Sequence, residues 1–317
     1  ETVLIKYKHI MEEAIVRVEH LSHRYSVDWA IRDINLEVKS KGVFGLLGSN
    51  GAGKSTTMNI ICGVLNQTEG NVWINNINLR ENPVEAKKFI GFLPQRPPLY
   101  PDMTVEEYLT YCANLRLMEP MEIGKAVERA MARCGVTHFR SRLLRNLSGG
   151  YQQRIGIAQA IVHHPQFVVL DEPTNGLDPN QIVEIRNLIK ELATDHAVML
   201  STHILPEVQA TCDEIRMIEH GKVVFSGSMD DFDNYVAPTS FTATLVNAPA
   251  IEELVKLKGI TSVDCLGDCH YRFHIAETDG ITEKMIATSV ANGWQLEEIQ
   301  LERLSLDEIF ARLSGKK

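Results

Sequence analysis

The chain has 317 residues, and since domains usually hold ~100–200 residues, we expect two of them. Apolar residues make up 44% and charged residues 23%, which is typical of a globular protein that buries its own core. The net charge of −9 argues against a dedicated nucleic-acid-binding protein, which usually has an excess of basic residues. We find no secretory signal and no run near the ~20 apolar residues of a membrane-spanning helix.

Cysteine usage indicates a reducing, intracellular compartment, because most of the cysteines lie in apolar periodic segments and resemble small buried hydrophobic residues. The six are Cys62, Cys112, Cys134, Cys212, Cys265 and Cys269. The last two lie near Asp264, Asp268 and His270, so a metal site is conceivable. Their spacing matches no strong zinc pattern, and we favour a loop with free thiols.

The first part of the chain alternates apolar and polar residues. Residues 15–38 are predicted to form two strands, and we expect residues 1–14 to be an N-terminal extension. A short buried strand over 43–48 leads into a glycine-rich loop and a helix. A strand pair over 70–79 and a strand over 89–95 follow.

The segment 97–165 is predicted to be a helical subdomain. Thr104 and Glu107 have the spacing of a capping box at a helix start. A second periodic stretch follows, and a third helix begins at Ser148, a residue type suited to an N-cap.

Alternation of strands and helices returns after the helical subdomain. Residues 167–171 are continuously apolar up to the final aspartate, the pattern of a strand in a sheet covered on both faces. A helix over 182–192, a strand over 196–202 and a hairpin over 215–225 follow. Together with the preceding elements, they predict one α/β domain over 15–228.

The C-terminal part of the chain has a different pattern. Residues 229–237 have the composition of a linker. The following segment, 238–317, is predicted to have the order βαββαβ, which is the ferredoxin-like arrangement of a small α+β domain. A last helix is expected to begin at Ser305, where Glu308 repeats the capping-box spacing.

The segment that follows the strand over 43–48 satisfies the phosphate-loop pattern G-x-x-x-x-G-K-[ST]. It consists of Gly48, Ser49, Asn50, Gly51, Ala52, Gly53, Lys54 and Ser55. Glycines let successive N–H groups face phosphate oxygens, and the helix N-terminus adds partial positive charge. Lys54 can reach the β- and γ-phosphates and Ser55 can ligate Mg²⁺. This pattern predicts a nucleoside triphosphate site.

Two more segments carry candidate chemistry. Asp171 ends the strand over 167–171, where ligands gather in open α/β sheets, and is a candidate Mg²⁺ ligand. Glu172 follows and is placed to polarise the water that attacks the γ-phosphate. Residues 147–154, LSGGYQQR, place glycines at the start of a helix, where backbone N–H groups can meet an anion.

Together these three motifs resemble those of the ATP-binding subunits of ABC transporters. Residues 48–55 resemble the Walker A loop, 147–154 the LSGGQ signature and 167–172 the Walker B strand with its catalytic glutamate. Two positions depart from the common pattern: Tyr151 replaces a glutamine after LSGG, and Ser49 replaces a proline. Tyrosine-bearing signatures occur in the branch of drug, polysaccharide and gliding-type exporters. Both departures are interpreted as variants that leave activity intact.

The resemblance assigns further roles in the expected order along the chain. It implies that Tyr25 stacks on adenine, that Gln95 senses Mg²⁺ and the attacking water, and that His203 contacts the γ-phosphate. It also places Asp178 in the D-loop. The implied ATP contacts are Tyr25, Gly48, Ser49, Asn50, Gly51, Ala52, Gly53, Lys54, Ser55 and Thr56; the signature is Ser148, Gly149, Gly150 and Tyr151; the catalytic residues are Glu172, His203 and Gln95; the Mg²⁺ ligands are Ser55, Gln95 and Asp171.

The family mechanism implies partners as well as ATP and Mg²⁺. One active site needs two chains, so we expect a dimer with a second copy or a similar ATPase subunit, and no nucleic acid. We also expect a separate transmembrane permease that contacts residues 95–104, at the inner face of the cell membrane, in an exporter. The alternatives are a soluble ABC ATPase of translation or DNA repair, and a catalytically silent ATP-gated regulator. The cargo and the role of the C-terminal domain cannot be inferred from the sequence.

Overall fold

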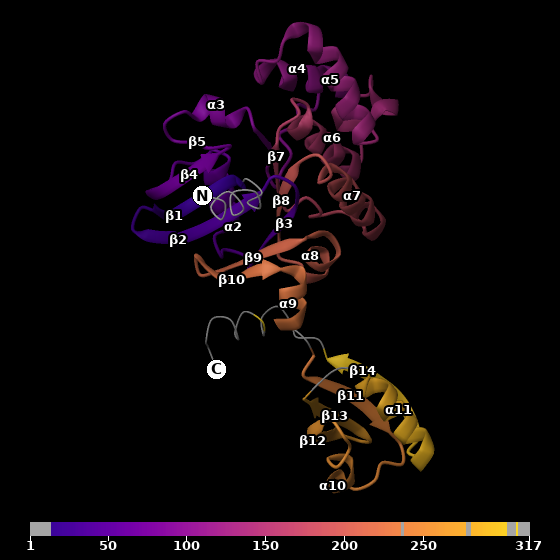
Figure 1. Cartoon of the computed structure of the whole chain (residues 1–317). Coiled ribbons are helices and arrows are strands. Elements are labelled where there is room, and N and C mark those ends of the chain that lie inside the picture. The colour runs from indigo at the N-terminus through magenta and orange to yellow at the C-terminus, as the bar shows by residue number, and fades with distance from the viewer. Residues whose placement is uncertain (1–13, 236–237, 277–279, 303–308, 310–317) are drawn as a thin grey trace, which may run out of the picture. The chain divides into compact units, whose positions relative to one another are not determined.

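The computed structural model describes residues 14–235, 238–276, 280–302 and 309 (Figure 1). These residues divide into two compact units, with the division between Met229 and Asp230. Among the described residues, no helix combines the length and apolar character needed to cross a membrane.

The first sheet of the first unit is antiparallel and has the order β2-β1-β4-β5. Its strands are β1 (Ala14–Tyr25), β2 (Asp28–Lys39), β4 (Glu69–Ile74) and β5 (Ile77–Asn78). Alternate residues such as Val16 and Val18 are buried, whereas Arg17 is paired with Glu19 at the surface. The predicted strand pairs over 15–38 and 70–79 are confirmed.

The second sheet has six strands in the order β10-β9-β3-β8-β7-β6. All of its strand pairs are parallel except the one between β9 and β10. Its strands are β3 (Gly42–Leu47), β6 (Ile90–Leu93), β7 (Phe167–Asp171), β8 (Ala197–Thr202), β9 (Glu214–Glu219) and β10 (Lys222–Ser228). Every residue of β7 and β8 is buried, as predicted for a sheet covered on both faces.

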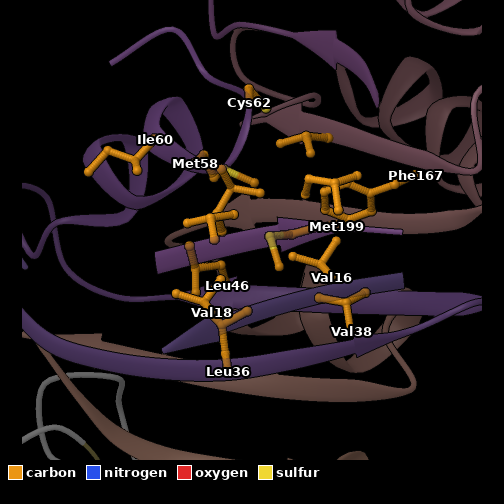
Figure 2. Close-up of a cluster of buried hydrophobic side chains, with 14 of the residues drawn as sticks. Val16, Val18, Leu36, Val38, Leu46, Met58, Ile60, Cys62, Phe167 and Met199 are labelled. Atoms are coloured by element: carbon orange, nitrogen blue, oxygen red, sulfur yellow. The ribbon is translucent and has the colours of Figure 1, made fainter. Parts of the chain in front are cut away.

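One hydrophobic core joins the two sheets through α2 (Lys54–Ile61). Figure 2 shows Met58 of this helix with Leu46 of β3, Phe167 of β7 and Val18 of β1. The helix that begins in the phosphate loop is therefore held by packing from both sheets, and this packing fixes the position of Lys54 at its start.

The predicted helical subdomain contains α4 (Val105–Leu115), α5 (Pro120–Arg133) and α6 (Gly149–Ile161). The capping box of Thr104 and Glu107 at the start of α4 is present. Ser148 occupies the N-cap position of α6, as predicted, but its side chain makes no capping hydrogen bond.

Three further helices of the first unit complete the connections between strands. They are α3 (Pro83–Lys87), α7 (Pro179–Leu192) and α8 (Leu205–Thr211). The sequence analysis predicted only α7. The other two are short and end within two turns, so they carry little of the 3.6-residue periodicity on which a prediction depends.

The second unit contains one antiparallel sheet of order β12-β13-β11-β14. Its elements are β11 (Ser240–Leu245), α10 (Ile251–Leu254), β12 (Ile260–Gly267), β13 (His270–Ile275), α11 (Ile281–Asn292) and β14 (Leu296–Glu302). This order is the predicted βαββαβ. Residues 229–235, expected to belong to a linker, form α9 (Met229–Tyr235), which places the buried Phe232 on a helix. The helix expected from Ser305 lies outside the described residues.

Candidate functional site

The phosphate loop joins β3 to α2 and wraps around the side chain of Lys54. The Lys54 ammonium donates hydrogen bonds to the backbone carbonyls of Gly48, at 2.8 Å, and Ser49, at 3.0 Å. Gly53 has a φ of 110°, a conformation that favours glycine. A Cβ at Gly48 would lie 2.4 Å from the carbonyl oxygen of Ile218, so only glycine fits there.

The charge of Lys54 sits among three carboxylates. Burial lowers the pKa of the Lys54 ammonium because an apolar surrounding disfavours the cation. The nearby carboxylates of Glu172, Asp171 and Glu219 oppose that shift. Glu219 also accepts a hydrogen bond from the Ser49 hydroxyl at 2.9 Å. The enclosed Lys54 cation can donate charge-assisted hydrogen bonds to a polyphosphate that replaces its present backbone acceptors.

Asp171 ends β7 beside the start of α2. Its Oδ1 accepts hydrogen bonds from the Ser55 hydroxyl, at 3.3 Å, and from the Ser201 hydroxyl of the neighbouring strand β8. Hydroxyl and carboxylate oxygens are the ligands that Mg²⁺ prefers. Two of the three predicted metal ligands, Ser55 and Asp171, therefore fit a hard cation, and the structure brings them together. The third, Gln95, donates its hydrogen bond to Glu172.

Glu172 is held by several groups at once. It has a φ of 47°, which is uncommon for a residue other than glycine. Its carboxylate accepts hydrogen bonds from Gln95 Nε2 at 2.9 Å and Asn175 Nδ2 at 3.2 Å, and His203 Nδ1 lies 3.1 Å away. Its backbone N–H donates to the Ser201 hydroxyl at 2.9 Å. The three predicted catalytic residues thus meet at one carboxylate.

A buried carboxylate that the sequence analysis missed supports this arrangement. Glu207 of α8 is 5% exposed and accepts hydrogen bonds from the hydroxyls of Thr174, at 2.8 Å, and Thr202, at 2.9 Å. It links the loop after Glu172 to the end of β8, next to His203. No spacing in the sequence marks it, because its partners come together only through the parallel pairing of β7 and β8.

The signature segment lies at the start of α6. Ser148 and Gly149 are exposed, whereas Gly150 is buried. The Tyr151 ring lies edge-on to Phe139, with centroids 4.6 Å apart, so it packs within its own chain. In the described residues, the side-chain hydrogen bonds of Lys54 and Glu172 go to the partners named above and none goes to 148–151.

The D-loop and the adenine candidate complete the predicted site. Asp178 precedes α7 and caps it, because its side chain accepts a hydrogen bond from the backbone N–H of Gln181 at 3.0 Å. Tyr25 at the end of β1 is 53% exposed, and its ring stands edge-on to His23 at 4.7 Å between centroids. An exposed ring supported from one side can stack on a base.

Comparison with known proteins agrees with this geometry. The family model described as "ABC transporter" matches residues 31–175. The Bacillus subtilis ABC transporter ATP-binding protein YdbJ is 35% identical over 225 residues, which cover 70% of this chain and 72% of YdbJ. The chain therefore belongs to the ATP-binding proteins of ABC transporters, and it is an ABC-type ATPase.

Two further matches refine the comparison. The linearmycin resistance ATP-binding protein LnrL of Bacillus subtilis is 27% identical over 307 residues and is matched over 95% of this chain and 99% of its own length. A solved dimer of the ATP-binding cassette MJ0796, bound to ADP and phosphate in a post-hydrolysis state, aligns with a TM-score of 0.61 at 27% identity, covering 68% of this chain and 98% of that chain. These relatives give no support to a role in translation or DNA repair.

Proposed function

We propose that this chain hydrolyses ATP with Glu172 as the residue that orients the attacking water. The observation that carries the proposal is the convergence of Gln95, Asn175 and His203 on the Glu172 carboxylate. A fixed carboxylate next to the phosphate loop can accept a proton from water and direct its lone pair towards the terminal phosphate. His203 then stabilises charge on that phosphate.

The remaining residues bind and neutralise the nucleotide. Lys54 and the backbone N–H groups of 48–56 hold the β- and γ-phosphates, and Tyr25 stacks on the base. Ser55 and Asp171 would hold Mg²⁺ with Gln95 at the side of the attacking water, and the ion would neutralise phosphate charge. The Gln95 amide is hydrogen-bonded to Glu172, so it can exchange the Glu172 carboxylate for the attacking water as its partner.

The signature implies a second chain. Ser148 and Gly149 are exposed at a helix N-terminus, where N–H groups can bind the γ-phosphate of ATP on another copy. The dimeric state of the related cassette bound to ADP and phosphate supports this arrangement. We propose that two chains enclose two ATP molecules, that Asp178 lines the shared surface, and that hydrolysis reopens the pair.

The work of hydrolysis is proposed to drive export through a separate transmembrane subunit. The similarity to a resistance ATP-binding protein over nearly the whole chain supports the exporter branch. We assign 15–228 to the ATPase domain and 238–317 to the accessory domain, and we place the chain at the inner face of the cell membrane. The loop 95–104, which connects Gln95 to α4, would contact the membrane subunit.

Substitution of Glu172 by glutamine tests the proposal. We expect Glu172→Gln to bind ATP normally and to slow hydrolysis by about a hundredfold or more, because the amide cannot accept the proton. Phosphate release by the purified chain with Mg²⁺ and ATP measures the rate. Glu191→Gln, on the exposed side of α7, is the matched control and keeps the rate. Normal turnover by Glu172→Gln would show that another group is the base.

A further inference from the structure

The signature segment rests against α7 at its glycine. Gly150 is buried, and a Cβ built on it would lie 2.7 Å from the side-chain amide carbon of Gln181 and 2.9 Å from its amide oxygen. By contrast, a Cβ on Gly149 would meet no atom within 4 Å. The Gln181 amide therefore packs directly against Gly150, and a side chain at 150 would have to displace it.

A second contact joins the same two helices one turn further along each. The Arg154 guanidinium lies 2.7 Å from the Glu184 carboxylate and also donates a hydrogen bond to the backbone carbonyl of Cys134 at 3.0 Å. The Arg154 side chain is 17% exposed, against 59% for Glu184. Arg154 thus connects three helices, because Cys134 ends α5, Arg154 lies on α6 and Glu184 lies on α7.

Between these contacts the helices leave a groove of about 250 Å³. It is lined on one side by Ser148, Gly150 and Tyr151 and on the other by Asp178, Asn180 and Gln181. Because the helices do not pack continuously here, their separation depends on a few named contacts. The first turn of α7 is also the turn that Asp178 caps through the N–H of Gln181.

We propose that Gln181 and the Arg154–Glu184 ion pair are positioning elements that hold the signature segment in register with the loop after Glu172. This inference rests on the proposed function, in which the signature acts on ATP of the second copy. The Asn175 side chain donates a hydrogen bond to the Glu172 carboxylate. Further along the chain, Gln181 contacts Asp178 through its backbone N–H and Gly150 through its side-chain amide. Neither Gln181 nor Glu184 is among the residues assigned above to the chain's own nucleotide site, so their substitution should change turnover without changing how the phosphate loop binds ATP.

A double-mutant cycle in the full-length chain tests the contact at Gly150. We expect Gly150→Ala to lower kcat by about tenfold, because the added methyl group displaces the Gln181 amide from its place beside the signature segment. Gln181→Ala removes the same contact from the other side, so it should also lower kcat, and the double variant should lose no more activity than Gly150→Ala alone. Binding of a fluorescent ATP analogue to the single chain should be the same in all four proteins. A Gln181→Ala variant with wild-type turnover, or losses that multiply in the double variant, would overturn the proposal.

The ion pair gives a second variant if Gly150→Ala does not fold. Glu184→Ala leaves Arg154 bonded to Cys134 and should lower kcat by about threefold at unchanged ATP binding. Lys190→Ala, an exposed position on α7, is the control and should match the wild type. Turnover of Glu184→Ala equal to that of the control would contradict the inference. If the wild type itself fails to hydrolyse ATP, or Glu172→Gln hydrolyses it normally, the proposed function fails instead.

Discussion

The first unit has a cluster of polar side chains around one carboxylate, and the charged groups named here in the second unit form pairs across a sheet. In the first unit, Glu172 adopts an uncommon backbone conformation and gathers three side chains around one carboxylate. In the second unit, charged groups pair across the sheet: Arg272 binds Glu302 through two nitrogens, and His274 lies 2.8 Å from Asp264. In the first arrangement three side chains contact one carboxylate, whereas in the second each charged side chain contacts one partner of opposite charge.

This difference distinguishes charged groups that stabilise a fold from side chains that form a candidate functional site. Paired charges on a sheet face stabilise the sheet by modest amounts, and the two pairs named here direct their charges at each other. Convergent side chains on a strained residue are typical of a functional site. We therefore expect ATP hydrolysis to depend on the site of the first unit and to continue when the second unit is destabilised.

Removal of an aromatic ring from the second unit gives the largest expected change in stability. Phe273 is fully buried and stacks on Phe241 at 4.7 Å between ring centroids. Phe273→Ala should lower the free energy of unfolding of this unit by about 4 kcal/mol while ATP hydrolysis continues. Calorimetric unfolding measures the first effect and phosphate release the second. Val290→Ala, at a site 77% exposed, is the control. If Phe273→Ala abolished ATP hydrolysis as well as destabilising the second unit, the two units would not be independent in the way proposed here.

The next largest effect concerns nucleotide binding in the first unit. Lys54→Ala removes the enclosed cation of the phosphate loop and should weaken ATP binding by about a hundredfold, since charge-assisted hydrogen bonds contribute roughly 1.5–3 kcal/mol each. Titration with a fluorescent ATP analogue measures the change. Lys41→Ala, an exposed lysine before β3, should bind ATP normally. Equal affinities for the two variants would place the triphosphate elsewhere.

Acid should weaken the first unit through a partly buried histidine. Burial lowers the pKa of His163 from 6.5 to about 3, and the positive charge of Arg116 adds to the shift. The unfolded chain therefore takes up a proton that the folded chain refuses, so stability present above pH 6.5 is lost as the pH falls towards 3. Between pH 7 and pH 5 this loss is about 2 kcal/mol.

A substitution isolates the contribution of His163. Its Nε2 lies 3.0 Å from the carbonyl oxygen of Ile90, and glutamine at this position can keep a donor there without titrating. His163→Gln should therefore show a smaller drop in unfolding free energy between pH 7 and pH 5 than the wild type, in denaturant titrations at the two pH values. An unchanged pH dependence would mean that other groups cause the acid sensitivity.

Much of the architecture followed from local pattern. Strong alternation and continuous apolar runs predicted the strands of both units, and two of the motifs, 48–55 and 167–172, predicted residues that meet beside the phosphate loop. The sequence did not predict α8 or its buried Glu207, because a short helix carries little periodicity and the partners of Glu207 meet only through strand pairing. Serine is a residue type suited to the N-cap position that Ser148 occupies, yet the Ser148 side chain makes no capping hydrogen bond to α6.

The contact between Gly150 and Gln181 could not be predicted for the same physical reason. The two residues lie in different motifs, and only the packing of α6 on α7 brings them together. Tyr151 likewise looked like a substitution within a nucleotide-binding motif. Its ring packs edge-on against Phe139 of its own chain, a tertiary contact that the motif alone does not encode.

The central claim is that ATP on one copy is closed over by the signature of another. The most direct measurement is the mass of the Glu172→Gln chain in solution with ATP, by light scattering. We predict a particle of about twice the 35.6 kDa chain mass, and a single chain when Ser148→Phe is added, with ATP still bound to Lys54. A dimer that persists with Ser148→Phe, or a single chain in both cases, would contradict the account.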